Sequence, residues 1–280
     1  MNPFSKTLLL IPVFCLCGYT YAENGVSFER YRTNRFSRPL PGRVFLTNNE
    51  LLTYKITWAG ITGGYASLSS QTVSHADSNS NFVPLGKNIS KECVIFRITG
   101  QTTPFVSLFY NLEMELLSIG EPGTYHAWFY RENRLERGNR FFHTLDFTHY
   151  TNAYIFRDIK NNKTNLKPIP AEKTSLDVVS SLYAARSIDL EPETITEMQV
   201  YYREKLYDIQ IITIGKEIIN TQWGKKTAIL IIPRMEFKGV FMNKSDIIIY
   251  LSDDEHKIPL AMQSKLSVGT FRATLIEGYY

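Results

Sequence analysis

The sequence has few cysteines, and two of the three lie together near the N-terminus. Cys15 and Cys17 belong to an apolar N-terminal run, and Cys93 is the third. Once that run is removed, a single thiol excludes an internal disulfide, so the remaining chain has to be held together by a core. Cys93 lies in the apolar stretch CVIFRI, where a lone cysteine is usually a small buried hydrophobe.

A strong charge of either sign is also missing. The chain has 31 Lys and Arg against 27 Asp and Glu. So mild a balance does not indicate nucleic acid as a partner, because nucleic-acid-binding domains are strongly basic on one face. The sequence shows no phosphate-binding glycine loop, dinucleotide fingerprint, nucleophile elbow or zinc signature. We therefore assign no catalytic residue, metal or cofactor.

Long apolar runs are absent beyond the N-terminus. There, Lys6 precedes a run from Leu8 to about Cys17, and Thr20 and Ala22 follow as small residues. This layout predicts a signal peptide over residues 1–22, with a membrane anchor as the alternative. The run is shorter than the roughly 20 residues of a spanning helix. We expect an exported protein, periplasmic and not membrane-spanning after cleavage.

Residues 23–48 are polar and rich in arginine, and we expect a basic, irregular N-terminal arm. An arm draped over the surface is the plain interpretation. The alternative is contact with anionic phosphate or polysaccharide, which suit the guanidinium fork. The candidates for such contacts are Arg30, Arg32, Arg35, Arg38 and Arg43.

From residue 49 onward the pattern predicts strands. Large apolar residues occupy every second position of ELLTYKITW (50–58), which is typical of a half-buried strand. The glycines of AGITGG (59–64) then indicate a hairpin turn that needs no ligand to explain it. The stretch 106–117 is apolar on both alternating sets, so we expect a strand buried on both faces. Further long strands are predicted within 125–156, with turns near 132–133, 138–139 and 151–152.

One helix is predicted, over about residues 174–187. Thr174 or Ser175 can cap it, Asp177 falls in its first turn, and an apolar stripe follows. Strand patterns resume after it and continue to the C-terminus. The predicted fold is therefore mainly β: a single large antiparallel curved sheet or partly closed barrel over residues 49–280, with one short inserted helix.

Four segments in this order carry a resemblance to a known family. They are ELLTYKITWAGITGGYASL, SLDVVSSLYAAR, WGKKTAILIIP and IYLSDDEHKIPLAMQSKLSVGTFRATL. Together they resemble the exported bacterial domain-of-unknown-function 3108 family over roughly residues 49–277. The resemblance implies a β-rich protein of the bacterial envelope. It brings no catalytic residue, because the family has no established activity.

We predict a non-catalytic binding protein for a hydrophobic or glycan component of the envelope. A curved sheet creates a concave face, and such mouths are common ligand sites. Aromatic residues that could line it, or could simply fill the core, are Trp58, Tyr65, Phe105, Phe109, Trp128 and Tyr130.

Three alternatives remain open at this stage. The first is a structural or assembly factor that contacts another envelope protein through its sheet edges and arginine arm. The second is a hydrolase of envelope polymer or lipid that uses Asp253, Asp254 and His256, although SDDEHKIP (252–259) is more typical of a hairpin turn. The third is an outer-membrane barrel, which strands apolar on both faces disfavour. His143 and His149 lie too far apart along one strand to share a metal ion.

Overall fold

A computed structural model describes residues 30–35, 49–73, 92–148, 153–158, 160–168, 175–237, 240–242, 246–266 and 269–279. The predicted signal peptide, residues 1–22, lies outside this part of the chain. So do Arg38, Arg43, His149 and the predicted turn at 151–152.

Strands dominate the described chain. The first nine are β1 (Arg32–Arg35), β2 (Glu50–Trp58), β3 (Ile61–Val73), β4 (Cys93–Thr102), β5 (Leu112–Gly120), β6 (Ala127–Glu136), β7 (Asn139–Thr148), β8 (Ala153–Asp158) and β9 (Lys163–Pro168). The others are β10 (Leu176–Asp177), β11 (Thr194–Tyr202), β12 (Lys205–Thr221), β13 (Gly224–Phe237), β14 (Val240–Met242), β15 (Asp246–Ser252), β16 (Pro259–Leu266) and β17 (Gly269–Tyr279). Two helices, α1 (Pro104–Ser107) and α2 (Val178–Ser187), interrupt them.

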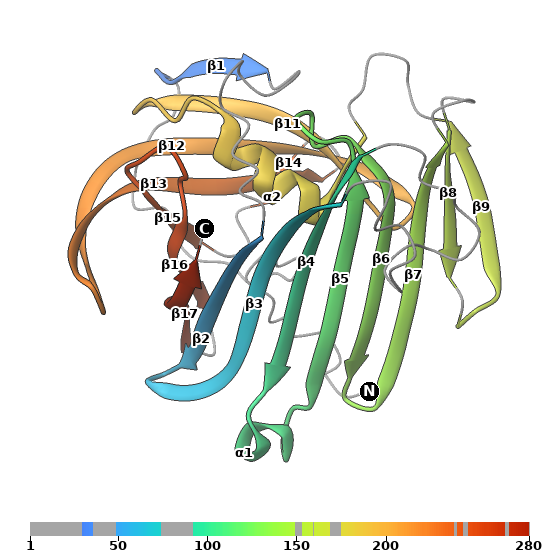
Figure 1. Cartoon of the computed structure of the whole chain (residues 1–280), viewed down its shortest axis with the longest axis horizontal. Coiled ribbons are helices and arrows are strands. Elements are labelled where there is room, and N and C mark those ends of the chain that lie inside the picture. Colours follow the sequence, from blue (N-terminus) through green and yellow to red (C-terminus); the bar gives the residue numbers. More distant parts are fainter. Residues whose placement is uncertain are drawn as a thin grey trace.

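All these strands belong to one sheet, and this confirms the predicted fold class. The order runs from β11 through β12, β13, β15, β16, β17 and β2 to β9, and each of these neighbours is antiparallel. The sheet is mixed because β1 and β10 pair with β11 in parallel. It curves strongly without closing into a ring among the described strands (Figure 1).

Side chains bridge the two ends of the curved sheet. Lys163, on the edge strand β9, donates to Glu204 in the β11–β12 turn, at 2.9 Å from Nζ to Oε2. Asn165, two residues further along β9, also donates to this carboxylate. The edge strand therefore lies beside the opposite end of the sheet, which makes the fold barrel-like.

The structure differs from the predicted pattern in three segments. Arg32–Arg35, inside the arm expected to be irregular, form β1 and pair with Thr194–Glu197 of β11. The turn expected near 132–133 is absent, because β6 continues through it to Glu136. The strand expected over 106–117 begins only at Leu112, because α1 precedes it.

The β2–β3 hairpin turns more tightly than predicted. Ala59 and Gly60, with φ of 47° and 85°, form its two-residue turn, and β3 begins at Ile61. Positive φ at both positions suits the twist of antiparallel strands. Gly64 instead lies within β3, where an added Cβ would be 2.4 Å from the backbone oxygen of Gln101. Close packing of two strands therefore requires this glycine.

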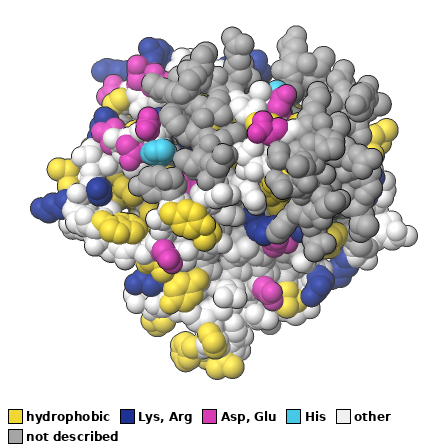
Figure 2. Space-filling model, viewed as in Figure 1, with side chains coloured by type: hydrophobic (Ala, Val, Ile, Leu, Met, Phe, Trp, Pro, Cys, Tyr) yellow, Lys and Arg dark blue, Asp and Glu magenta, His cyan; other side chains and the backbone are white. Residues whose placement is uncertain are grey.

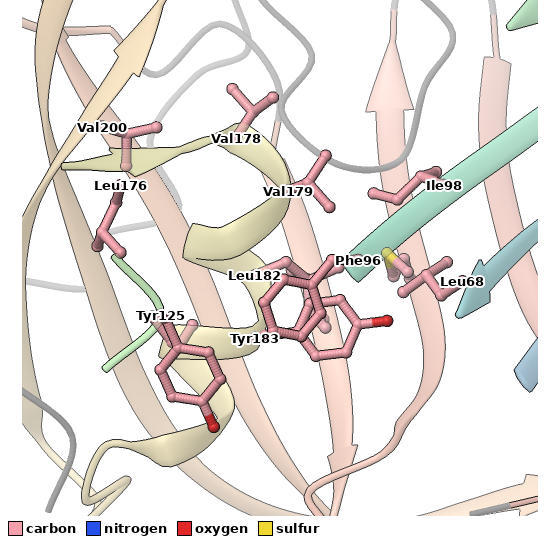
Figure 3. Packing of buried hydrophobic residues seen from close by; sticks show 14 of the residues in the cluster. Leu68, Phe96, Ile98, Tyr125, Leu176, Val178, Val179, Leu182, Tyr183 and Val200 are labelled. Carbon is pink, nitrogen blue, oxygen red and sulfur yellow. The ribbon is translucent and has the colours of Figure 1, made fainter. Parts of the chain in front are cut away.

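Helix α2 lies inside the curve of the sheet, at the end where β4 begins and β5 ends (Figure 1). All ten of its residues are buried. Tyr183 stacks on Phe96 of β4, with ring centroids 4.1 Å apart, and Figure 3 shows Leu182 and Tyr183 beside that ring. A helix that is buried on every side is part of the core, not a surface helix.

Polar contacts fix both ends of α2. Asp177, and not Thr174 or Ser175, is the N-cap, and its Oδ1 accepts from the amides of Val179 and Ser180 at 2.7 and 3.0 Å. At the other end Arg186 makes a paired contact with Glu50, at 2.9 and 2.6 Å, and both side chains are buried. The helix is therefore anchored to the first residue of β2.

Candidate ligand-binding cavity

A cavity of about 450 Å³ opens at the end of the sheet opposite α2. Its walls come from the far ends of β2 to β5, from α1 and from β16 and β17. The floor is formed by Tyr54, Leu68 and Ile98, which belong to the main core and are almost fully buried. The cavity is thus continuous with the apolar interior, and its size falls within the usual range for small-molecule sites.

The lining consists almost entirely of hydrocarbon and aromatic ring surface, and hydroxyl groups in it have partners within the protein. The Tyr54 hydroxyl donates to the Pro259 carbonyl at 2.7 Å, and Thr102 Oγ1 accepts from the Leu112 amide at 3.1 Å. The Tyr110 hydroxyl donates to Glu136. Burial, together with this hydrogen bond to Glu136, raises the pKa of Tyr110, so the phenol remains protonated.

Helix α1 forms one wall of the mouth. Its N-cap, Thr103, accepts from the Val106 amide at 3.4 Å, and Pro104 follows at a position that favours helix starts. The Thr103 amide also donates to the Gly63 carbonyl at 2.9 Å. The short helix is therefore docked on β3 by its own first turn.

The rim of the cavity is apolar and exposed. Phe105 and Phe109 line the cavity, yet they are 62% and 78% exposed, and Leu108 beside them is 77% exposed. Across the mouth, Trp58 is 41% exposed and stacks on Phe271 with centroids 5.8 Å apart. Figure 2 shows hydrophobic side chains gathered at the lower tip, where Figure 1 places α1. Large exposed apolar clusters are typical of surfaces that contact a protein, a membrane or a ligand.

The structure brings three of the six predicted lining residues together. Trp58, Phe105 and Phe109 line the cavity mouth. Tyr65 lies on the opposite face of the sheet, in a polar groove that also includes Arg97 and Arg140.

The other two predicted residues lie away from the cavity for reasons of packing. Trp128 packs against a small separate core cluster that includes Cys93. Tyr130 is fully buried in the main core. Cys93 itself is 2% exposed, as expected for a small buried hydrophobe.

The described arginines of the arm do not contribute to the cavity. Arg30, Arg32 and Arg35 are exposed. Arg32 forms an ion pair with Glu191, at 2.5 Å. Contact with an anionic polymer remains a prediction for this segment.

A buried charged network on β6, β7 and β8 was missed by the sequence analysis. Arg134 donates to Glu132 at 3.0 Å and also to Glu136, and all three side chains are buried. His143 lies between two carboxylates, with Nε2 at 3.4 Å from Asp158 and Nδ1 at 3.7 Å from Glu132. Charges that alternate in ENRLE (132–136) were the available signal, and the turn wrongly predicted there hid it.

The same network shows how burial and pairing compete. Burial raises the pKa of Glu132, but contact with His143 and the charges of Arg203 and Arg134 outweigh it, so its pKa lies below the ordinary value. The network reaches the cavity through Tyr110, which binds Glu136. Among the described residues, no group of three His, Cys, Asp or Glu side chains is arranged to hold a metal ion.

The acidic cluster at 252–259 is a turn, as its composition suggested. Asp254 Oδ1 accepts from the amides of His256 and Lys257, both at 3.0 Å, and from the Ser252 hydroxyl at 2.8 Å. Asp253 binds Lys216 at 2.8 Å. These carboxylates stabilise the connection between β15 and β16.

The sequence profile of DUF3108, described as a protein of unknown function, matches residues 53–276. The chain belongs to the DUF3108 family. No curated protein matches it. Within the described residues, no helix is both long and apolar enough to cross a membrane.

Two solved structures can be compared with this DUF3108 member. A β-barrel-like protein of the DUF1849 family from Brucella abortus has 8% identity and a TM-score of 0.52, and the alignment covers 82% of this chain and 97% of that one. A protein with a YmcC-like fold from Bacteroides fragilis NCTC 9343 has 9% identity and a TM-score of 0.32, with coverage of 88% and 100%. The likeness to the Brucella protein supports the barrel-like fold.

Proposed function

We propose that this DUF3108 protein is a non-catalytic binding protein of the bacterial envelope that holds an apolar ligand, such as an acyl chain, in the cavity. The observation that carries the proposal is an apolar cavity that reaches the core and opens through an exposed aromatic rim. Apolar ligands bind by removing such surface from water. The predicted signal peptide supports export.

The lining favours an acyl chain over a glycan. A sugar needs hydrogen-bond partners when it leaves water, and burying its hydroxyl groups without them costs free energy. Here the hydroxyl groups of Tyr54, Thr102 and Tyr110 already have partners within the protein. An acyl chain needs none, and it would cover the exposed rings of Phe105 and Phe109.

Trp58 provides a direct optical test. The chain has three tryptophans, so Trp128→Phe with Trp223→Phe leaves Trp58 as the only one. We expect fatty acids brominated along the chain to quench Trp58 fluorescence saturably, because the bromine atoms enter the cavity beside the ring. Unbrominated fatty acid of the same length should compete and restore the signal.

A matched pair of variants ties the signal to the cavity. Phe109→Ser removes an exposed aromatic ring that lines the mouth, whereas Ile218→Ser removes an apolar side chain of similar exposure, 68%, that is not part of the lining. Phe109→Ser should weaken binding by roughly three- to tenfold, as expected for partial loss of a ring contact that the bound ligand would cover. Quenching that is absent, unsaturable or equally affected by both variants would refute the proposal.

A further inference from the structure

The cavity lining contains a single charged residue, Arg137. It occupies the β6–β7 turn with Gly138, where φ values of 48° and 75° form a two-residue hairpin turn. The Arg137 amide donates to the Asn111 carbonyl at 2.9 Å, which fixes the turn against the chain that enters β5. Its side chain is exposed and lines the mouth, with the guanidinium carbon 4.9 Å from the centre of the Tyr110 ring.

Within the described part of the chain, no carboxylate forms an ion pair with Arg137. The acid next to it in sequence, Glu136, is bound to Arg134 and to the Tyr110 hydroxyl. Among the described residues, the guanidinium therefore packs over an aromatic ring and has hydrogen-bond donors that no carboxylate occupies. Its planar fork suits a carboxylate or a phosphate.

Resting on the proposed function, we propose that the ligand is an anionic amphiphile. Its acyl chain occupies the apolar cavity, and its carboxylate or phosphate head binds Arg137 at the mouth. In this pose the acyl chain contacts the apolar lining. The anionic head lies beside Arg137, the one cation of the lining. An uncharged ligand of the same length would fill the cavity but would gain nothing from the guanidinium.

Three ligands that share a 12-carbon chain and differ in their head groups distinguish the contribution of the head group from that of the chain. Dodecanoate, dodecyl phosphate and dodecanol are titrated at pH 8 as competitors of brominated fatty acid, with Trp58 quenching as the readout. Each is measured on the protein, on Arg137→Gln, on Arg137→Lys and on Arg140→Gln. Arg140 is an exposed arginine of the same hairpin that lines the groove on the opposite face of the sheet, so it is the matched control.

The proposal predicts that at least one anion binds more tightly than dodecanol, by roughly three- to tenfold, as expected for a partly exposed ion pair. Arg137→Gln should remove this preference without changing dodecanol binding, Arg137→Lys should restore part of it, and Arg140→Gln should leave it intact. Added salt should reduce the preference. The better of the two anions identifies the head group.

Other results overturn the proposal in distinguishable ways. If all three ligands bind equally, or if Arg137→Gln weakens dodecanol as much as the anions, the head-group assignment is wrong while the apolar cavity stands. If none of the three competes, the proposed function fails together with it. Thermal midpoints of all four proteins show whether any loss comes from unfolding.

Discussion

Asp177 is a fully buried carboxyl group at the start of α2, and changing it to asparagine should make the protein more stable at neutral pH. Oδ1 of Asp177 accepts from the Val179 and Ser180 amides, and Oδ2 accepts from the Ser118 hydroxyl at 2.5 Å. In Asp177→Asn, the amide oxygen can keep the first two contacts and its NH₂ group can donate to Ser118. Asparagine is also a good N-cap.

The magnitude follows from the pKa. Burial raises the pKa of Asp177 from 3.8 to about 6, against the opposing hydrogen bonds from Ser118, Ser180 and Val179. The native state therefore binds this proton more tightly than the unfolded chain does. Stability from this group is present below about pH 4 and is lost as the pH rises through about 6. A shift of about two units corresponds to about 3 kcal/mol.

Urea unfolding at pH 4, 5, 6 and 7.5 measures this effect. We expect Asp177→Asn to exceed the unchanged protein by up to about 3 kcal/mol at pH 7.5 and to approach it at pH 4. Asp208→Asn, which changes an exposed aspartate on β12, should show no such divergence. Parallel stability curves for Asp177→Asn and the unchanged protein, or a loss of stability at pH 7.5, would refute the reasoning.

Two further predictions concern packing and charge. Gly64→Ala should lower the free energy of unfolding by about 1–3 kcal/mol, because its Cβ would clash with the backbone oxygen of Gln101. Gly63→Ala should be nearly neutral, because the nearest atom to its Cβ would be 3.8 Å away. Equal urea midpoints for the two variants would contradict this prediction. Glu50→Ala should cost about 3–5 kcal/mol by leaving Arg186 buried without its partner, and Glu50→Leu combined with Arg186→Met should cost less than Glu50→Ala alone. Strict additivity in a double-mutant cycle would show that the pair is not coupled.

The alternation of large apolar residues predicted the strands well where one face is buried. Leu52 and Tyr54 are fully buried while Thr53 and Lys55 are half-buried, as the pattern of β2 required. The alternation of apolar and polar residues identifies such a strand because one face is buried and the other is more exposed to solvent. They also located α2, although its start moved to Val178 because Asp177 caps it.

The cavity could not be predicted to the same degree, since its walls meet only in three dimensions. Trp58 and Phe271 lie more than 200 residues apart in the sequence, yet they stack as register partners on the neighbouring strands β2 and β17. Helix α1 could have been recognised from Thr103 followed by Pro104, which are typical cap and first-turn residues. The apolar residues after them indicated a strand instead, and in the structure they are exposed on the rim.

The position of α2 has a consequence for exchange. Because this helix packs across one end of the curved sheet, a ligand bound as proposed would enter and leave through the mouth beside α1, at the opposite end. The protein would therefore offer a pocket with one mouth and not a channel through the sheet. Under the proposed function, a molecule that delivers the ligand and one that receives it would both have to contact this rim, so loading and release would compete for the same surface.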